Sequence, residues 1–201
     1  MEKEITKNRQ ATEMTLITAV NDIIEESGFE GLGINAVAAK AKVSKMLIYR
    51  YFNSLDGLIA AYIQQNDYWI NFDEELPDQA HLAAFIKQIF KRQIMRLREN
   101  YTLKRLYRWE LTTDNKFVKE LRNKREEKGI WLVEAVSKLS KHPKKEIAAM
   151  ASIITAAISY LALLEENCPV YNDLKIQQES GWEELEEGIN LLVDLWLQKQ
   201  L

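Results

Sequence analysis

The chain has 201 residues, of which 47% are hydrophobic and 28% are charged, and its formal net charge at pH 7 is −3. This length and composition allow one large hydrophobic core or two small ones. The negative net charge argues against a general polyanion-binding protein. A single cysteine, Cys168, excludes an intramolecular disulfide, and the polar start MEKEITKNRQ does not resemble a secretory leader. We therefore expect a cytoplasmic protein.

An all-α fold of about nine helices is predicted. Proline occurs at only three positions, and no segment alternates polar and apolar residues with the period of a strand. The first predicted helix carries an apolar run from Leu16 to Ile24, preceded by a polar arm with Lys7 and Arg9 that could reach a DNA backbone.

Two short helices with a very short connection are predicted between residues 34 and 52. The segment INAVAAKAK, residues 34–42, is rich in alanine and places its apolar residues on one stripe. Ser44 then serves as a helix N-cap, because its hydroxyl can accept a hydrogen bond from a backbone N–H two or three residues later. Only Lys42 and Val43 remain as a turn, so the helices must cross steeply, as in a helix-turn-helix.

The second of these helices has two different faces. Lys45, Met46 and Tyr49 share one face by the 3.6-residue period, and we expect them to face a DNA groove. Ile48 and Phe52 share another face, which we expect to pack against the core.

The side chains on the first face suit contacts with DNA. Lys45 can donate to guanine acceptors or phosphate, and Met46 can contact a thymine methyl group. Arg50 and Tyr51 are placed for phosphate oxygens. A surface helix of an ordinary helical bundle has similar spacing, so this pattern alone leaves both interpretations open.

A longer pattern surrounds these helices. It consists of an apolar first helix, a glycine–phenylalanine corner and the two motif helices with their caps. Its residues are Leu16, Ile17, Ala19, Val20, Ile23, Ile24, Gly28, Phe29, Val37, Ala38, Val43, Ser44, Lys45, Tyr49, Arg50, Tyr51, Phe52, Ser54 and Leu58. Over residues 15 to 58 the chain thereby resembles the N-terminal domain of the TetR family of bacterial transcriptional regulators.

The resemblance implies a helix-turn-helix DNA-binding domain of three helices over residues 1–53, and an effector-binding and dimerisation domain over residues 54–201. It implies a ligand-responsive repressor that binds an inverted-repeat operator as a homodimer. The DNA-contacting residues that it implies, together with the face described above, are Asn35, Ser44, Lys45, Met46, Tyr49, Arg50 and Tyr51.

Several positions depart from the family pattern. Ile34, Leu47 and Leu55 stand where the family commonly has polar residues, and they cannot donate to phosphate. Residues 1 to 58 hold seven Lys and Arg residues against eight Asp and Glu residues, a net charge of −1. These departures predict weak non-specific affinity. They keep open an alternative, a TetR-like protein with weakened DNA binding that acts as a protein-interaction or nucleoid-associated module.

The rest of the chain is predicted to be helical. We expect helices over residues 54–72, 82–97, 101–111 and 114–139, one from residue 143 and one from residue 180. Asp114 is the expected cap of the long helix that ends near Leu139. Pro143 suits the first turn of the next helix, and Ser180 begins a capping-box pattern ahead of the last one.

Aromatic residues are concentrated in the segment from residue 62 to residue 131. The resemblance implies an effector pocket there, lined by aromatic walls and a few polar groups. The candidate residues are Trp69, Phe72, Phe90, Gln93, Tyr107, Trp109 and Glu110. Core packing or solvated ion pairs are the alternative roles for each of them.

The two last helices, near residues 143–165 and 180–199, are the predicted homodimer surface. Residues 147 to 164 carry no charge and would extend about 27 Å, just short of a hydrocarbon core of roughly 30 Å. The many small residues favour close packing against another helix over membrane insertion. Coverage of this helix within one chain is the alternative to a dimer.

No enzyme is predicted. His81 and His142 lie far apart in the sequence, and Cys168 has no base near it. The seven glycines form no phosphate-binding loop, and no metal-ligand spacing occurs. We expect no catalytic residue, metal or cofactor, and we expect double-stranded DNA and an unknown small-molecule effector as partners.

Overall fold

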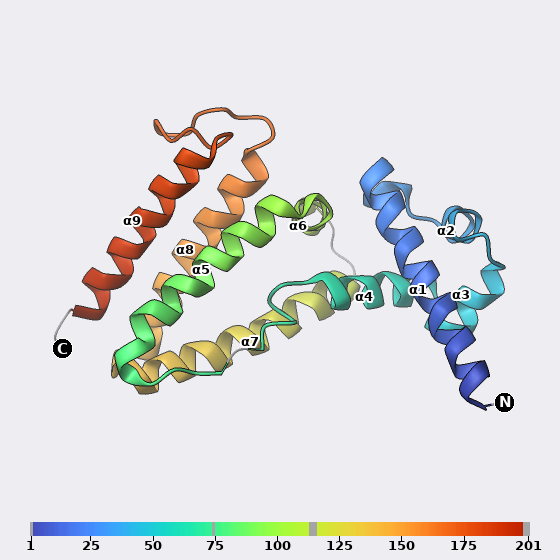
Figure 1. Cartoon of the computed structure of the whole chain (residues 1–201), viewed down its shortest axis with the longest axis horizontal. Coiled ribbons are helices and arrows are strands. Elements are labelled where there is room, and N and C mark those ends of the chain that lie inside the picture. The colour runs from blue at the N-terminus through green and yellow to red at the C-terminus, as the bar shows by residue number, and fades with distance from the viewer. Residues whose placement is uncertain (1, 74, 113–115, 199–201) are drawn as a thin grey trace. The chain divides into compact units, whose positions relative to one another are not determined.

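The computed structural model describes residues 2–73, 75–112 and 116–198, without the side chains of residues 2–8 and Phe117. The described residues form nine α-helices, two short 3-10 helices and no β-strand beyond one isolated bridge. The all-α prediction is therefore confirmed. The helices are α1 Glu2–Ser27, α2 Ile34–Ala41, α3 Lys45–Phe52, α4 Leu55–Asn66, α5 Leu82–Glu99, α6 Tyr101–Thr112, α7 Lys116–Ser140, α8 Lys144–Leu164 and α9 Glu179–Gln198 (Figure 1).

The chain divides into two compact units, and each unit consists of two segments that are not consecutive in the sequence. The first unit consists of Met1–Asn71 and Tyr101–Lys124, and the second of Phe72–Asn100 and Arg125–Leu201. Helix α6 thus belongs to the same unit as the helix-turn-helix, and α7 passes from one unit into the other. A functional boundary between residues 53 and 54 stays a prediction.

The core of the first unit forms around α1. This helix packs against α2, α4 and α6, and α3 packs against α4. Leu16, Val20 and Ile24 lie one turn apart on α1 and are fully buried, as the apolar run predicted. Val37 and Ile48 add one buried side chain each from α2 and α3.

The core of the second unit forms between α5, α8 and α9, which lie side by side in Figure 1. A mostly apolar stripe is buried along α5. Its buried residues are Leu82, Ile86, Ile89, Phe90, Gln93, Ile94 and Leu97. Gln93 is the one polar residue of that set.

Helix α4 ends at Asn66, several residues before the predicted end near Phe72. Polar side chains compete with the helix for backbone groups there. The Asp67 carboxylate accepts a hydrogen bond from the backbone N–H of Ile70 at 3.0 Å, and the Asn71 amide donates to the Asp67 carbonyl at 2.7 Å. These bonds stabilise a turn in place of a further helical turn.

The last helix begins earlier than predicted. Because α9 starts at Glu179, Ser180 lies inside its first turn, and the predicted capping box at Ser180 is wrong. The preceding loop packs on this turn instead. A Cβ atom on Gly181 would lie 2.5 Å from the Lys175 carbonyl oxygen, and the Trp182 indole N–H donates to the Ile176 carbonyl at 2.8 Å.

The predicted ends of α7 and α8 fall close to the observed ones. Helix α7 ends at Ser140, one residue after the predicted position, and Pro143 is the N-cap of α8. Asp114, the expected cap of α7, lies outside the described residues.

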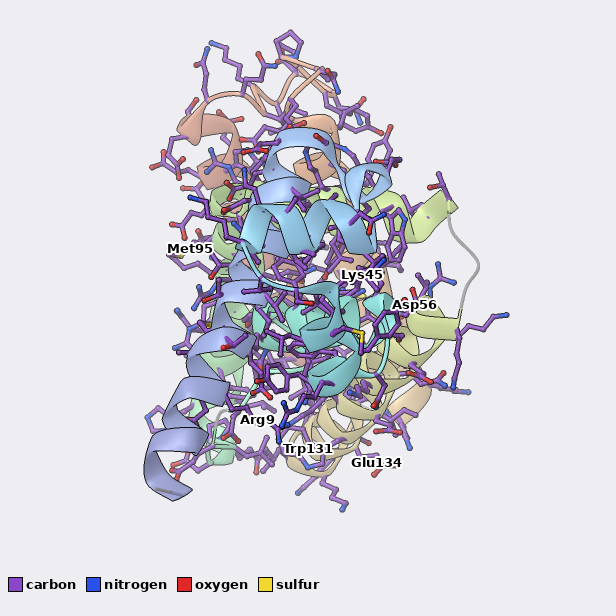
Figure 2. All side chains as sticks on the ribbon, turned by 90° about the vertical axis from the view of Figure 1, so that its right-hand side faces the viewer. Arg9, Lys45, Asp56, Met95, Trp131 and Glu134 are labelled. Carbon is purple, nitrogen blue, oxygen red and sulfur yellow. The ribbon has the colours of Figure 1, made fainter. Side chains whose placement is uncertain are left out.

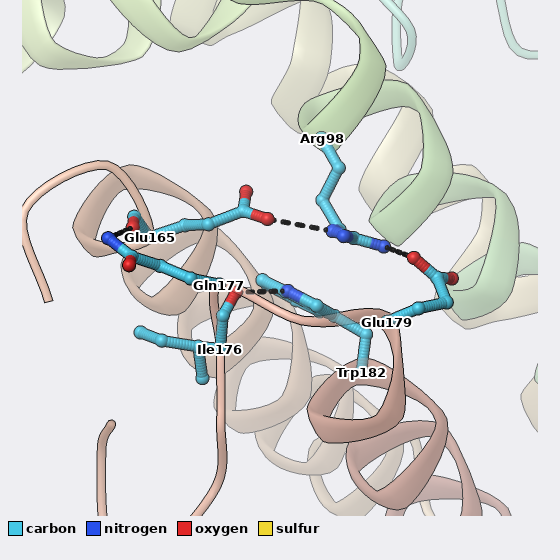
Figure 3. A network of polar contacts seen from close by, with 6 residues as sticks. All are labelled: Arg98, Glu165, Ile176, Gln177, Glu179 and Trp182. Carbon is cyan, nitrogen blue, oxygen red and sulfur yellow. Dashed lines mark hydrogen bonds and ion pairs between the residues drawn. The ribbon is translucent and has the colours of Figure 1, made fainter. Parts of the chain in front are cut away.

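Arg98 connects α5 to both ends of the loop between α8 and α9. Its Nε donates to Glu165 at 3.0 Å, just beyond α8, and its Nη1 donates to Glu179 at 2.6 Å, at the start of α9 (Figure 3). The guanidinium also lies 5.0 Å from the centre of the Trp182 ring. One arginine thereby holds three elements of the second unit together.

Candidate nucleic-acid interface

A tight turn joins α2 to α3, as predicted. Lys42 ends α2 in the left-handed conformation, with φ 54° and ψ 39°. Its backbone N–H and that of Val43 both return to carbonyl groups in the last turn of α2, which satisfies acceptors left open at the helix end. The chain then extends at Ser44, whose hydroxyl accepts a hydrogen bond from the backbone N–H of Met46 at 3.3 Å. The prediction of Ser44 as N-cap is confirmed.

Helix α3 presents the two faces expected from its sequence. Met46 is 66% exposed and Tyr49 is 47% exposed, and Lys45 lies on the same open face. Ile48 is fully buried in the first unit, and Phe52 is half-buried. The solvent face of α3 therefore carries an ammonium group, a thioether and a phenol, with no partner from the described protein covering it.

The end of α3 is held against the start of α4 by a very close approach. Asn53 takes a left-handed conformation with φ 65°, and the Ser54 hydroxyl accepts a hydrogen bond from the backbone N–H of Gly57 at 2.9 Å. A Cβ atom on Gly57 would lie 2.0 Å from the Phe52 carbonyl oxygen. Only glycine fits at this position, and no local pattern in the sequence indicates this close approach.

Two basic residues near α3 are engaged with acidic partners. The Arg9 Nε donates to the Glu13 carboxylate at 2.7 Å, and the Arg9 guanidinium carbon lies 5.4 Å from the centre of the Tyr51 ring. Lys40 pairs with Glu26, and this hydrogen bond raises the pKa of Lys40. The side chain of Lys7, the other basic residue of the predicted arm, lies outside the described residues.

The remaining predicted DNA contacts lie at the surface of the first unit. Asn35 is exposed in the first turn of α2, which begins after Gly33 in extended conformation. Arg50 is exposed and Tyr51 is half-buried in the last turn of α3. In Figure 2, Arg9 and Lys45 are both seen on the side of the first unit that faces the viewer.

The seven residues predicted to line an effector pocket are distributed over the two units. Trp69, Tyr107, Trp109 and Glu110 belong to the first unit, and Phe72, Phe90 and Gln93 to the second. Trp109 stacks on Phe29, with ring centroids 4.7 Å apart and ring planes at 15°. Trp109 therefore packs against the corner between α1 and α2, within the first unit.

Gln93 is the polar residue with the clearest unmet capacity for hydrogen bonding. It is 1% exposed, and its amide nitrogen makes only long contacts, 3.4 Å to the Ser159 hydroxyl and 3.5 Å to the Thr155 carbonyl. Its amide oxygen has no hydrogen-bond partner among the described residues. A buried amide oxygen of this kind can accept a donor from a bound molecule or water.

Helix α6 docks on the corner at the end of α1 by contacts that the sequence analysis missed. Arg105 donates to the carbonyl of Ile24 at 2.9 Å, which caps the last turn of α1, and Trp109 lies one turn further along the same helix face. In the sequence, the only sign of these contacts is an arginine and a tryptophan four residues apart. Their partners, Ile24 and Phe29, could not be identified from the sequence because each lies about eighty residues away in the chain.

Helices α8 and α9 leave a large apolar surface uncovered. Ile153 and Tyr160 are exposed two turns apart on α8, and Leu191, Leu192 and Leu195 are exposed on α9. Ile189 and Val193 take the buried positions on α9.

Among the described helices, α8 alone is long and apolar enough to cross a membrane by length and composition. Core helices of soluble proteins meet the same criterion. Of its most apolar eighteen-residue window, 28% is buried within the chain, and apolar side chains such as Ile153 and Tyr160 are exposed along it.

A capped helix with an exposed polar and apolar face, joined to a preceding helix by the three residues 42–44, is typical of a helix-turn-helix DNA-binding fold. Residues 16–62 match the family model described as bacterial regulatory proteins, tetR family. Residues 16–62 thus form an N-terminal domain of the TetR family, and the resemblance seen in the sequence of this domain is confirmed. No curated protein matches the chain.

Solved structures share the fold over nearly the whole chain. An HlyIIR mutant protein with a GSSGSSG linker in place of an internal segment has a TM-score of 0.60 at 17% identity, covering 91% of this chain and 95% of that one. A transcriptional regulator from Rhodococcus sp. Rha1 has a TM-score of 0.60 at 21% identity, covering 92% and 96%. A TetR-like transcriptional regulator from Rhodococcus sp. RHA1 has 0.50 at 19%, covering 94% and 97%. The chain thus has the fold of a TetR-family transcriptional regulator.

Proposed function

We propose that this protein is a ligand-responsive transcriptional repressor that binds an inverted-repeat DNA operator as a homodimer. The observation that carries the proposal is the solvent face of α3, where Lys45, Met46 and Tyr49 project from a capped helix anchored by buried Ile48. These side chains combine a donor for guanine or phosphate with apolar and phenolic groups suited to base edges in the major groove.

The charges around α3 set the expected salt dependence. Lys42, Lys45 and Arg50 are exposed at this site, whereas Lys40 and Arg9 are paired with carboxylates. If each protomer neutralises three or four phosphates, a dimer neutralises about seven, and log K falls with log salt at a slope of about −6. Non-specific affinity is expected to be weak because Leu47 and Leu55 offer no donor.

Dimerisation through α8 and α9 is supported by their exposed apolar side chains. Two copies joined there would present two recognition helices to DNA. Helices about 34 Å apart enter successive major grooves on one face of the duplex, so the half-operators should form an inverted repeat. A cytoplasmic location and the absence of enzymatic activity belong to this proposal, since TetR-family regulators are generally DNA-binding proteins without catalysis.

Release of DNA by an effector is the regulatory part of the proposal. The buried Gln93 amide oxygen supports a ligand that carries a hydrogen-bond donor, and nearby Phe90 would supply an apolar wall. A ligand that prefers the conformation with misplaced recognition helices shifts a two-state equilibrium away from DNA. A tenfold release requires only about 1.4 kcal/mol of differential binding.

The proposal is tested by fluorescence anisotropy with the DNA upstream of the protein's own gene and with an unrelated duplex at low salt. We expect the parent to bind the upstream DNA with the salt slope given above. Tyr49→Ala and Arg50→Ala should each weaken binding at least tenfold. Arg96→Ala, which removes an exposed arginine from α5, is the matched control and should leave affinity unchanged.

The alternative function gives a different result in the same titrations. A TetR-like protein-interaction module would leave both duplexes unbound even at low salt. A nucleoid-associated module would bind both duplexes equally and weakly. Either outcome, or a salt slope near zero, would overturn the proposal of an operator-binding repressor.

A further inference from the structure

A contact between α1 and the recognition helix changes the role expected for Arg9. The guanidinium of Arg9, in the third turn of α1, lies over the ring of Tyr51, in the last turn of α3, at 5.4 Å from the ring centre. These two residues are more than forty positions apart in the sequence. Nothing in the local pattern of either helix predicts the contact.

The charge of Arg9 is already engaged within the protein. Its Nε donates to the Glu13 carboxylate one turn further along α1, at 2.7 Å, and this bond raises the pKa of Arg9. Glu13 offsets much of the positive potential that a DNA phosphate would meet. Arg9 is therefore a poor phosphate ligand in this conformation, although the sequence alone suggested that role.

The same arrangement restrains the orientation of the Tyr51 side chain. Its side chain is half-buried, and its hydroxyl is a candidate for a phosphate contact. An unrestrained tyrosine would lose rotamer freedom when it binds DNA. A guanidinium held by Glu13 and lying over the ring removes part of that freedom beforehand, which is a gain in preorganisation.

We propose that Arg9 is a positioning residue for DNA binding, which holds Tyr51 in its binding orientation through the stacked guanidinium and does not itself bind phosphate. This inference rests on the proposed function. It names a contact from α1 as a determinant of the recognition helix. The proposed role needs a planar cationic group that can pair with Glu13 and lie over the Tyr51 ring at the same time. Arginine has such a group and lysine lacks it.

Arg9→Lys separates the two roles, because it keeps the charge and removes the planar group. We expect Arg9→Lys and Arg9→Gln to weaken operator binding to a similar extent. A cation–π contact at an exposed site corresponds to about 2- to 5-fold, and two such sites in a dimer to about 5- to 30-fold. The slope of log K against log salt should stay within about 0.5 of the parent value in both variants.

A double-mutant cycle with Tyr51→Ala tests whether the effect passes through Tyr51. If Arg9 acts by positioning, Arg9→Gln has little further effect in the Tyr51→Ala background. Arg96→Gln on α5 is the matched control and should be neutral. Thermal unfolding of each variant shows whether the first unit remains folded, and NMR shifts of the Tyr51 ring protons without DNA should move in Arg9→Lys.

A direct phosphate role gives the opposite pattern. Arg9→Lys would then keep most of the affinity, Arg9→Gln would lower the magnitude of the salt slope by about 2 for the dimer, and its effect would add to that of Tyr51→Ala. Any of these results overturns the inference, as does unchanged affinity in Arg9→Gln. A parent protein that binds no DNA overturns the proposed function instead, and unmoved ring shifts in Arg9→Lys then overturn the contact itself.

Discussion

Gly57 leaves no room for a side chain where α4 begins against the end of α3. Alanine has a higher helix propensity than glycine by about 1 kcal/mol, so propensity alone predicts that Gly57→Ala is stabilising. The close approach predicts the opposite. A Cβ atom 2.0 Å from the Phe52 carbonyl must displace one of the two helices.

We expect Gly57→Ala to lower the free energy of unfolding by about 2 kcal/mol or more, measured by urea denaturation, and to weaken DNA binding. Gly129→Ala is the matched control, because a Cβ atom there would meet nothing within 4 Å on α7. The control should be neutral or stabilising by up to about 1 kcal/mol. Equal effects in both variants would contradict the steric explanation.

Tyr62 makes the stability of the first unit fall at alkaline pH. Burial raises the pKa of its phenol to about 12, and the hydroxyl donates to the Asn21 side chain at 3.1 Å. The folded pKa lies above the value of about 10 expected in the unfolded chain. The resulting stability is therefore fully present below pH 10 and is lost as the pH rises toward 12.

This effect should be visible as a difference between the parent and Tyr62→Phe. Between pH 9 and pH 11 the parent should lose about 1.4 kcal/mol more than the variant, measured by urea denaturation at each pH. Other tyrosines and lysines titrate in the same range, but they contribute equally to both proteins. A difference that stays constant over this range would show that Tyr62 titrates normally.

At the scale of elements, the helix-turn-helix was predictable because its signals are local. A capping serine, a short turn and a 3.6-residue apolar spacing act over a few residues, and the structure has all three between residues 34 and 52. The ends of α4 and the start of α9 were not predictable in the same way. Competing side-chain bonds at Asp67, and a loop packed on Gly181, decide those boundaries.

The loop between α8 and α9 depends on Arg98, whose forked donors reach Glu165 and Glu179 at once. Lysine carries the same charge but has no planar fork and stacks less well on Trp182. We expect Arg98→Lys to lower the free energy of unfolding by about 1–2 kcal/mol.

Arg96→Lys, on the exposed side of the same helix, is the matched control and should be neutral. Both variants can be compared by thermal unfolding, together with limited proteolysis of the loop. Increased cleavage in Arg98→Lys alone would support the role of the fork. No difference between the variants would mean that charge alone is sufficient.

For the whole molecule, the exposed apolar surface of α8 and α9 predicts the assembly state. Leu191 is 59% exposed and Leu195 is 57% exposed, one turn apart on α9. A charge at both positions should prevent burial of this surface in a dimer. We expect Leu191→Glu combined with Leu195→Glu to be monomeric in light scattering coupled to size-exclusion chromatography.

The same variant should lose most of its operator affinity, because two half-sites can no longer be bound by one particle. Leu111→Glu, at an even more exposed leucine on α6, is the control and should remain dimeric. A parent protein that is monomeric at micromolar concentration would contradict the dimer prediction.

Sequence by itself determined the helical class of the protein, the family of its N-terminal domain and the two faces of the recognition helix, because caps, turns and helical periodicity are local. Tertiary structure alone decided which distant groups meet. It placed α6 in the unit of the helix-turn-helix, set Trp109 on Phe29, held Arg9 over Tyr51 and left no space at Gly57. Such contacts join residues far apart in the chain, and they follow from how whole helices pack.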